Sequence, residues 1–99
     1  MIIVAGTLRI PADRVADLLP AASAQLAASR AEDGCLSYAY AFDVEEPGLL
    51  RVFEQWESRA HLEAHFRQPH MTPWREALAA AGAHDRNLLC YEAGPGEPV

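Results

Sequence analysis

The order of extended and helical patterns along the chain constrains its fold more than any other feature. Apolar and β-branched runs alternate with helical spacing in the order strand, helix, strand, strand, helix, strand. The predicted strands are 2–9, 35–42, 49–57 and 87–93, and the predicted helical segments are 12–32, 59–66 and 72–81. This order is that of the ferredoxin-like βαββαβ motif, an α+β fold built on an antiparallel sheet. We expect one domain over residues 1–93 and a frayed tail over 94–99.

Proline, serine and glycine mark the ends of the predicted helices. Pro11 suits a first helical turn, and Ser58 is a suitable N-cap for the second helical segment. Pro69 breaks that segment, and Gly82 stops the next one. Within the first helix, Pro20 interrupts the pattern and is expected to bend it. The apolar positions that recur at helical spacing there are Val15, Leu18, Leu19, Ala22 and Leu26.

The first predicted strand is apolar on both faces. Ile2, Val4 and Leu8 alternate on one face, and Ile3 and Ala5 occupy the other. An antiparallel sheet with one face in water would instead alternate apolar and polar residues. The helical segments can cover only one face, so we expect a second copy of the chain to cover the other and form a homodimer.

Composition excludes several classes of function. The formal net charge is −6, lysine is absent, and the eight arginines are scattered, so no basic stripe suited to nucleic acid exists. The sequence shows no membrane span and no signal peptide, which predicts a cytoplasmic protein. A glycine-rich nucleotide fingerprint is also missing. The two cysteines, Cys35 and Cys90, are expected to be small buried thiols rather than a disulfide.

Three of the four histidines fall between Phe53 and Met71, close to Trp56. Histidine titrates near neutrality, so an aromatic pocket that contains it can take a proton from an acidic organic molecule. His65 falls at the edge of the apolar face of its helix, and we expect it to be the base or the hydrogen-bond partner of the resulting anion. His70 is the second catalytic candidate, although a role in capping the next helix competes with it.

Aromatic side chains are the expected walls of this pocket. The candidates are Tyr38, Tyr40, Trp56, Phe66 and Trp74. The two tyrosines share a predicted strand face with Leu36 and Phe42, and they either line the pocket or only fill the core. A core role competes with a pocket role for Trp56, whereas Trp74 fits a lid and a subunit contact equally well.

The sequence gives little support for a metal site. His61 and His65 are four residues apart, but Leu62 stands where the H-E-x-x-H motif has glutamate, and spacing fixes no third ligand. We therefore expect no bound metal. Glu54 is expected to pair with an arginine, Arg51 or Arg86, rather than to act as a base.

Two longer stretches resemble a known family. They are EDGCLSYAYAFDVEEPG, residues 32–48, and RVFEQWESRAHLEAHFRQPHM, residues 51–71. Their E-x-W-x-S, L-x-x-H and P-H elements are similar to those of the antibiotic-biosynthesis monooxygenase (ABM) domain, in particular its quinol-monooxygenase-like members. The resemblance covers nearly the whole chain in the same element order. It implies a ferredoxin-like homodimer, a dimeric α+β barrel, with a pocket between each sheet and its own helices.

The resemblance also implies a range of activities. Some members oxygenate phenolic or quinol-type substrates without flavin, haem or metal, whereas others degrade haem, isomerise small metabolites or have no known activity. Haem-degrading relatives carry an asparagine, a tryptophan and a haem-ligating histidine where this chain has Thr7, His65 and approximately Arg75. That departure disfavours haem degradation, and Thr7 is carried over as a substrate-binding position.

We therefore expect a cofactor-independent monooxygenase that oxidises a small, electron-rich aromatic of the quinol or polyphenol type with molecular oxygen. The expected partners are this substrate, oxygen and a second copy of the chain, without nucleic acid or membrane. Two alternatives stay open. One is a small-ligand binding module, and the other is an isomerase of small metabolites in which His65 or His70 shuttles a proton.

Overall fold

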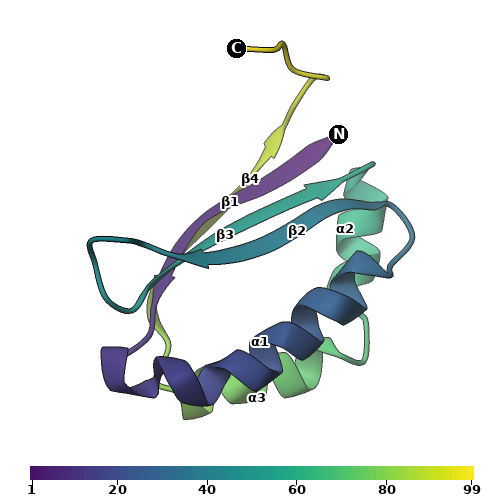
Figure 1. Ribbon diagram of the computed structural model, residues 1–99. Helices are drawn as coiled ribbons and strands as arrows, with labels where there is room; N and C mark the ends of the chain where they lie inside the picture. The colour runs from purple at the N-terminus through teal and green to yellow at the C-terminus, as the bar shows by residue number, and fades with distance from the viewer.

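The computed structural model describes residues 1–99 and contains one four-stranded antiparallel sheet with helices on one face (Figure 1). The strands lie in the order β2-β3-β1-β4. The elements are β1 (Ile2–Arg9), the 3-10 turn η1 (Ala12–Arg14), α1 (Val15–Arg30), β2 (Cys35–Phe42), β3 (Leu49–Trp56), α2 (Arg59–Phe66), α3 (Met71–Ala80) and β4 (His84–Glu92). The predicted ferredoxin-like α+β fold is confirmed.

The central strand β1 separates a covered face from an open face. It pairs with β3 on one side and with β4 on the other. Ile2, Val4 and Leu8 are buried towards the helices, as the alternation predicted. Leu8 packs in a cluster with residues of α1 and α3, which run side by side beneath the sheet (Figure 1), whereas Ile2 and Val4 pack in a second cluster with Leu62 of α2. The core therefore fills the space between this face of the sheet and the helices.

Helix α1 differs from the prediction in two respects. It begins at Val15, after the short 3-10 turn, and it continues through Pro20 to Arg30. Leu19, expected on the inner face, is 49% exposed, while Leu18 and Gln25 are buried. Burying the stripe that contains Leu18 outweighs the hydrogen bond that Pro20 cannot donate. Leu19 is the next residue along the helix, so its side chain points to a different side from that stripe.

A bulge near the start of β2 corrects a second expectation. The register with β3 shifts between Cys35 and Ser37, which inserts one extra residue. Leu36 occupies this irregular position and is 51% exposed, so it does not share the inner face with the tyrosines. Tyr38 and Tyr40, beyond the bulge, face the helices. The alternation used for the prediction fails where one residue is inserted.

The ends of the other elements follow their local signals more closely. The Ser58 side chain accepts a hydrogen bond from the His61 backbone N–H, as expected for an N-cap. Gly82 follows α3 with a φ of +82°, the left-handed conformation that favours glycine. Strand β4 starts three residues earlier than predicted, because the ladder with β1 continues to His84, which pairs with Arg9. Residues 84–86 are polar and show no alternation of apolar side chains, so the sequence pattern did not predict them as part of the strand.

The open face of the sheet carries large apolar side chains. Phe53 of β3 and Leu89 of β4 both pair with Ala5 of β1, and Tyr91 of β4 pairs with Ile3. The three large side chains are 41%, 55% and 50% exposed, respectively. No helix of this chain lies over them (Figure 1).

Two further sequence predictions can be compared with the structure. Cys35 and Cys90 are free thiols, as expected, but neither is fully buried: Cys35 is half-buried, and Cys90 is exposed on the edge strand β4. An edge strand has a neighbour on one side only, which leaves its side chains less covered. None of the helices is long and apolar enough to cross a membrane.

Candidate functional site

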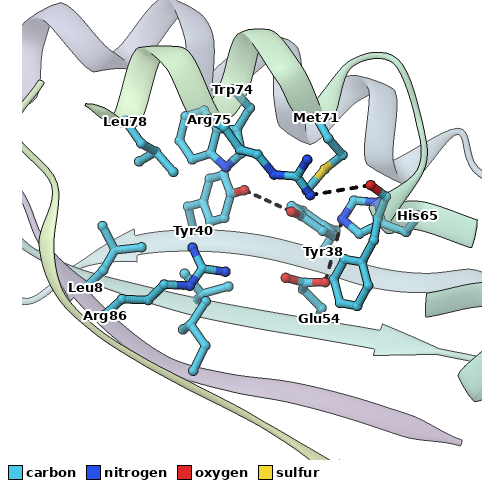
Figure 2. Close-up of a pocket in the computed structure, with 13 residues that line it drawn as sticks. Leu8, Tyr38, Tyr40, Glu54, His65, Met71, Trp74, Arg75, Leu78 and Arg86 are labelled. Carbon is cyan, nitrogen blue, oxygen red and sulfur yellow. Dashed lines mark hydrogen bonds and ion pairs between the residues drawn. The ribbon is translucent and has the colours of Figure 1, made fainter. Parts of the chain in front are cut away.

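A cavity of about 130 Å³ lies between the covered face of the sheet and the helices α2 and α3 (Figure 2). This volume is close to that of an apolar cavity of roughly 150 Å³ that binds benzene, so its size is of the order of a single aromatic ring. Both polar and apolar side chains line it. They are Leu8, Tyr38, Tyr40, Val52, Glu54, His65, Phe66, Met71, Trp74, Arg75, Leu78, Arg86 and Leu88.

Stacked aromatic rings form one wall of the cavity. Tyr40 of β2 lies against Trp74 of α3, with ring centroids 5.2 Å apart and planes 16° from parallel. The hydroxyls of Tyr38 and Tyr40 are 2.9 Å apart and share a hydrogen bond. Burial raises the pKa of both phenols above the ordinary value. The two hydroxyls therefore stay neutral near pH 7 and act as hydrogen-bonding groups rather than as bases.

An acid–base pair occupies the floor of the cavity. Glu54 of β3 and His65 of α2 both line it, with Glu54 Oε1 and His65 Nε2 4.0 Å apart (Figure 2). This separation is too long for a direct hydrogen bond, so a substrate hydroxyl can reach both groups. Burial raises the pKa of Glu54 to about 7, although Trp56 Nε1 donates a hydrogen bond of 3.1 Å to its carboxylate. His65 and a carboxyl group that can hold or release a proton near pH 7 therefore lie next to each other in the pocket.

A second carboxylate fixes the orientation of His65. Glu32, just beyond the end of α1, places Oε2 2.6 Å from His65 Nδ1. A carboxylate can only accept, so the proton sits on Nδ1 and the lone pair of the neutral ring is on Nε2, towards the cavity. Burial lowers the pKa of His65 below its ordinary value, and the Glu32 contact opposes this shift. His65 is thus a neutral, oriented proton acceptor near pH 7.

The same network extends to His70 and Gln25 behind the cavity. His70 Nε2 lies 2.8 Å from Glu32 Oε2, and His70 Nδ1 lies 2.8 Å from Gln25 Oε1. The Gln25 amide donates to the Tyr38 hydroxyl at 3.3 Å. A continuous set of hydrogen bonds therefore joins the pocket tyrosines to the carboxylate that orients His65.

The predicted site residues are distributed over four places. His65, Tyr38, Tyr40, Phe66 and Trp74 line the cavity. Trp56 is completely buried behind it, where its indole N–H holds Glu54. His70 lies outside the cavity and contacts it only through Glu32 and Gln25. Thr7 lies on the same face of β1 as Ile3 and Ala5, which is the open face of the sheet. It therefore does not line the cavity.

The expected ion pair between Glu54 and an arginine does not form. Glu54 has no arginine partner within ion-pair distance: Arg51 is paired with Asp43 at 3.0 Å, and Arg86 acts on Glu54 only through its charge, which lowers the Glu54 pKa. Side chains alternate between the two faces of a strand, so Arg51 and Glu54 lie on opposite faces of β3 and cannot pair. Phe66 lines the cavity as predicted, but at its edge, where it is 47% exposed rather than fully turned inward.

Several residues around the cavity had only a weak sequence signal. Gln25 is a polar residue seven positions after Leu18 on the apolar stripe of α1, and a buried amide there is a sign of a polar network. Glu32 was assigned to the end of the helix, and Arg86 lies in a polar stretch without alternation. Their approach to the site depends on tertiary packing.

One cluster has the residue types of a metal site. The ligand atoms of Glu32, His65 and His70 all lie within 4.8 Å of one another. Two ligands on one tetrahedral zinc, each about 2.0–2.2 Å from the ion, are about 3.3 Å apart. The contacts of 2.6 Å and 2.8 Å between Glu32 and the two imidazoles are instead hydrogen-bond lengths. This geometry suits shared protons better than a cation.

The fold and the cavity define a small ferredoxin-like α+β domain with one acid–base pair in an aromatic pocket. Comparison with family models assigns residues 1–77 to the antibiotic biosynthesis monooxygenase (ABM) family. The chain belongs to this family.

Relatives of known sequence agree with this assignment. The uncharacterized protein sll1783 of Synechocystis sp. strain PCC 6803 is 33% identical over 91 residues, which are 92% of this chain and 62% of that protein. The probable quinol monooxygenase YgiN of Escherichia coli K12 is 42% identical over 55 residues, which are 48% of this chain and 53% of YgiN. The chain therefore matches between half and two thirds of the length of these curated relatives.

Solved structures match over more of their length. A putative antibiotic biosynthesis monooxygenase from Deinococcus radiodurans superposes with a TM-score of 0.91 at 31% identity, covering 100% of this chain and 98% of the other. PA3566 from Pseudomonas aeruginosa superposes with a TM-score of 0.73 at 28% identity, over 91% and 87% of the two chains.

Proposed function

We propose that this chain is a cofactor-independent monooxygenase that oxidises a small, electron-rich aromatic of the quinol type. The observation that carries the proposal is the pairing of His65 Nε2 with Glu54 Oε1 inside a ring-sized aromatic pocket. The family assignment and the partial match to YgiN support the same class of reaction.

The first step would be removal of a phenolic proton. The substrate ring would pack against Tyr40 and Trp74, and one hydroxyl would point towards His65 Nε2. The proton would move to Nε2, and the hydrogen bond from Nδ1 to the Glu32 carboxylate would stabilise the imidazolium that forms. The apolar walls would keep water from competing for the anion.

The phenolate would then supply electrons directly to oxygen. One electron passes from the anion to O₂, and the resulting radical and superoxide combine to form a carbon–oxygen bond. Loss of water from the peroxide leaves one oxygen atom on the ring. For a quinol, the balance is quinol plus O₂ giving hydroxyquinone plus water, so the substrate provides all four electrons and no external reductant is needed.

The same acid–base pair also fits an isomerase. Glu54, with a pKa of about 7, can hold or release a proton at neutral pH and could return the one that His65 removes. Such a reaction would proceed without oxygen. Conversion of a substrate under strictly anaerobic conditions would therefore favour an isomerase over the monooxygenase.

We expect quinol-dependent oxygen consumption by the purified chain. With hydroquinone as substrate, an oxygen electrode should show uptake of one O₂ for each hydroxyquinone formed, and ¹⁸O₂ should label the product with one atom. Formation of hydrogen peroxide with an unlabelled quinone would indicate simple oxidation and contradict the proposal. Neither uptake nor anaerobic conversion would favour a binding module.

We also propose that two copies associate through the open face of the sheet. The large exposed residues of this face, Phe53, Leu89 and Tyr91, lie on adjacent strands beside β1, and a second sheet would bury them. Sedimentation equilibrium at micromolar concentration should give twice the 10.8 kDa of one chain.

The association can be tested on the same face. Leu89→Asp should shift the mass towards one chain, since it places a charge in the proposed interface. Leu19→Asp is a matched control, because Leu19 is similarly exposed but lies on α1, on the helical side. A wild-type chain that sediments as a monomer would contradict the proposal.

A further inference from the structure

Two arginines line the cavity without a carboxylate partner. Arg75 extends from α3 and Arg86 from β4, and both guanidinium groups point towards the cavity (Figure 2). Arg75 contacts only the backbone carbonyl of Phe66, at 3.4 Å, and Arg86 has no side-chain hydrogen bond or ion pair. Glu54 is the one carboxylate in the cavity lining, and neither arginine is within ion-pair distance of it.

Other arginines of the chain are used differently. Three of them form ion pairs with acidic side chains, namely Arg9 with Glu46, Arg14 with Asp17 and Arg51 with Asp43. The chain as a whole carries a net charge of −6. Arg86 acts on the one carboxylate of the lining, since its positive charge lowers the pKa of Glu54. Together with Arg75, the cavity still holds two positive groups against one carboxylate, a local reversal of the overall charge. Such a reversal attracts anions to the cavity and repels cations.

The position of the two arginines shows where an anionic group would sit. Both also line an adjoining outer groove of about 260 Å³, together with Leu78, Ala79 and Ala83. The guanidinium groups thus lie where the inner cavity meets this groove. His65 and Glu54 belong only to the inner cavity. A ring with its reacting hydroxyl at His65 would direct a second substituent towards the arginines.

From this arrangement we infer that the substrate is a single-ring hydroxylated aromatic that bears a carboxylate, which Arg75 and Arg86 bind. The inference rests on the proposed function for the ring and its hydroxyl, and adds the acidic group. A planar carboxylate matches the fork of N–H donors on a guanidinium group. The cavity volume limits the substrate to one ring, and the outer groove leaves room for the substituent.

Anaerobic calorimetry with two matched ligands tests this inference without requiring turnover. The ligands are 2,5-dihydroxybenzoate and hydroquinone, which differ by the carboxylate alone. Charge-assisted hydrogen bonds should make the dissociation constant of the acid about 10-fold or more lower. In Arg75→Gln and Arg86→Gln, this preference should fall to about 3-fold or less, while hydroquinone binding stays nearly unchanged. Arg86→Lys should restore part of the preference.

Arg67→Gln is the control, because Arg67 is exposed at the end of α2, has no ion pair and does not line the cavity. It should bind both ligands as the wild type does. Equal affinity of the wild type for the two ligands would overturn the inference. Loss of hydroquinone binding in the glutamine variants would also overturn it, since the arginines would then hold the phenolic oxygen. Preference for the acid without oxygen uptake would support the inference while contradicting the monooxygenase proposal.

Discussion

Replacement of His65 by glutamine is expected to lower the rate of oxygen uptake by about 10²–10⁴-fold, the usual effect of losing a positioned acid–base group. Glutamine can still donate a hydrogen bond to Glu32, which would otherwise lose a partner at 2.6 Å. It offers no basic nitrogen towards Glu54 and the substrate. The loss should therefore appear in kcat, measured with hydroquinone in an oxygen electrode, far more than in the melting temperature.

His61→Gln is the matched control for this experiment. His61 lies one turn earlier on α2, is partly exposed and bonds to Ser58 rather than to the cavity residues. Its substitution should leave oxygen uptake within about 2-fold of wild type, since it contacts no reacting group. Unchanged uptake in His65→Gln together with a lowered melting temperature would assign His65 a structural role, and Glu54 would become the candidate base.

Substitution of Glu54 by glutamine is expected to remove a pH-dependent loss of stability. Burial raises the pKa of Glu54 from 4.5 to about 7 in the folded chain. Between these two values the folded state binds a proton that the unfolded state has released, so the free energy of unfolding decreases as the pH rises from about 4.5 to 7. At about 1.4 kcal/mol for each pH unit, the decrease is on the order of 3 kcal/mol.

Glutamine has nearly the same shape and keeps an oxygen for the Trp56 indole, but it never becomes charged. The variant should therefore gain on the wild type as pH rises, by about 3 kcal/mol between pH 4.5 and pH 8 in urea unfolding. Glu63→Gln, at an exposed position of α2, should show no such trend. A constant difference between Glu54→Gln and wild type across this range would mean that Glu54 is not a buried, raised-pKa carboxyl.

The amino-acid sequence by itself determined the order of the elements and most of their ends. The apolar, β-branched run in 2–9 and the helical spacing in 12–32 are local patterns, and Ser58 and Gly82 act on the backbone next to them. These signals predicted the ferredoxin-like fold because each depends on neighbours in the chain. The pattern failed at Leu36, where a single inserted residue reverses which face a side chain occupies.

Only the tertiary structure decided which polar groups meet. Glu32 contacts His65 and His70 across 33 and 38 residues, and Gln25 contacts His70 across 45. The packing of α1 against α3 and the sheet sets these pairings, and no local spacing encodes them. Burial, which raises the pKa of Glu54, is likewise a property of the packed core. The sequence could therefore predict a histidine-containing aromatic pocket. The orientation of His65 beside Glu54, and the position of Arg75 and Arg86 at the cavity, arise only when the chain folds.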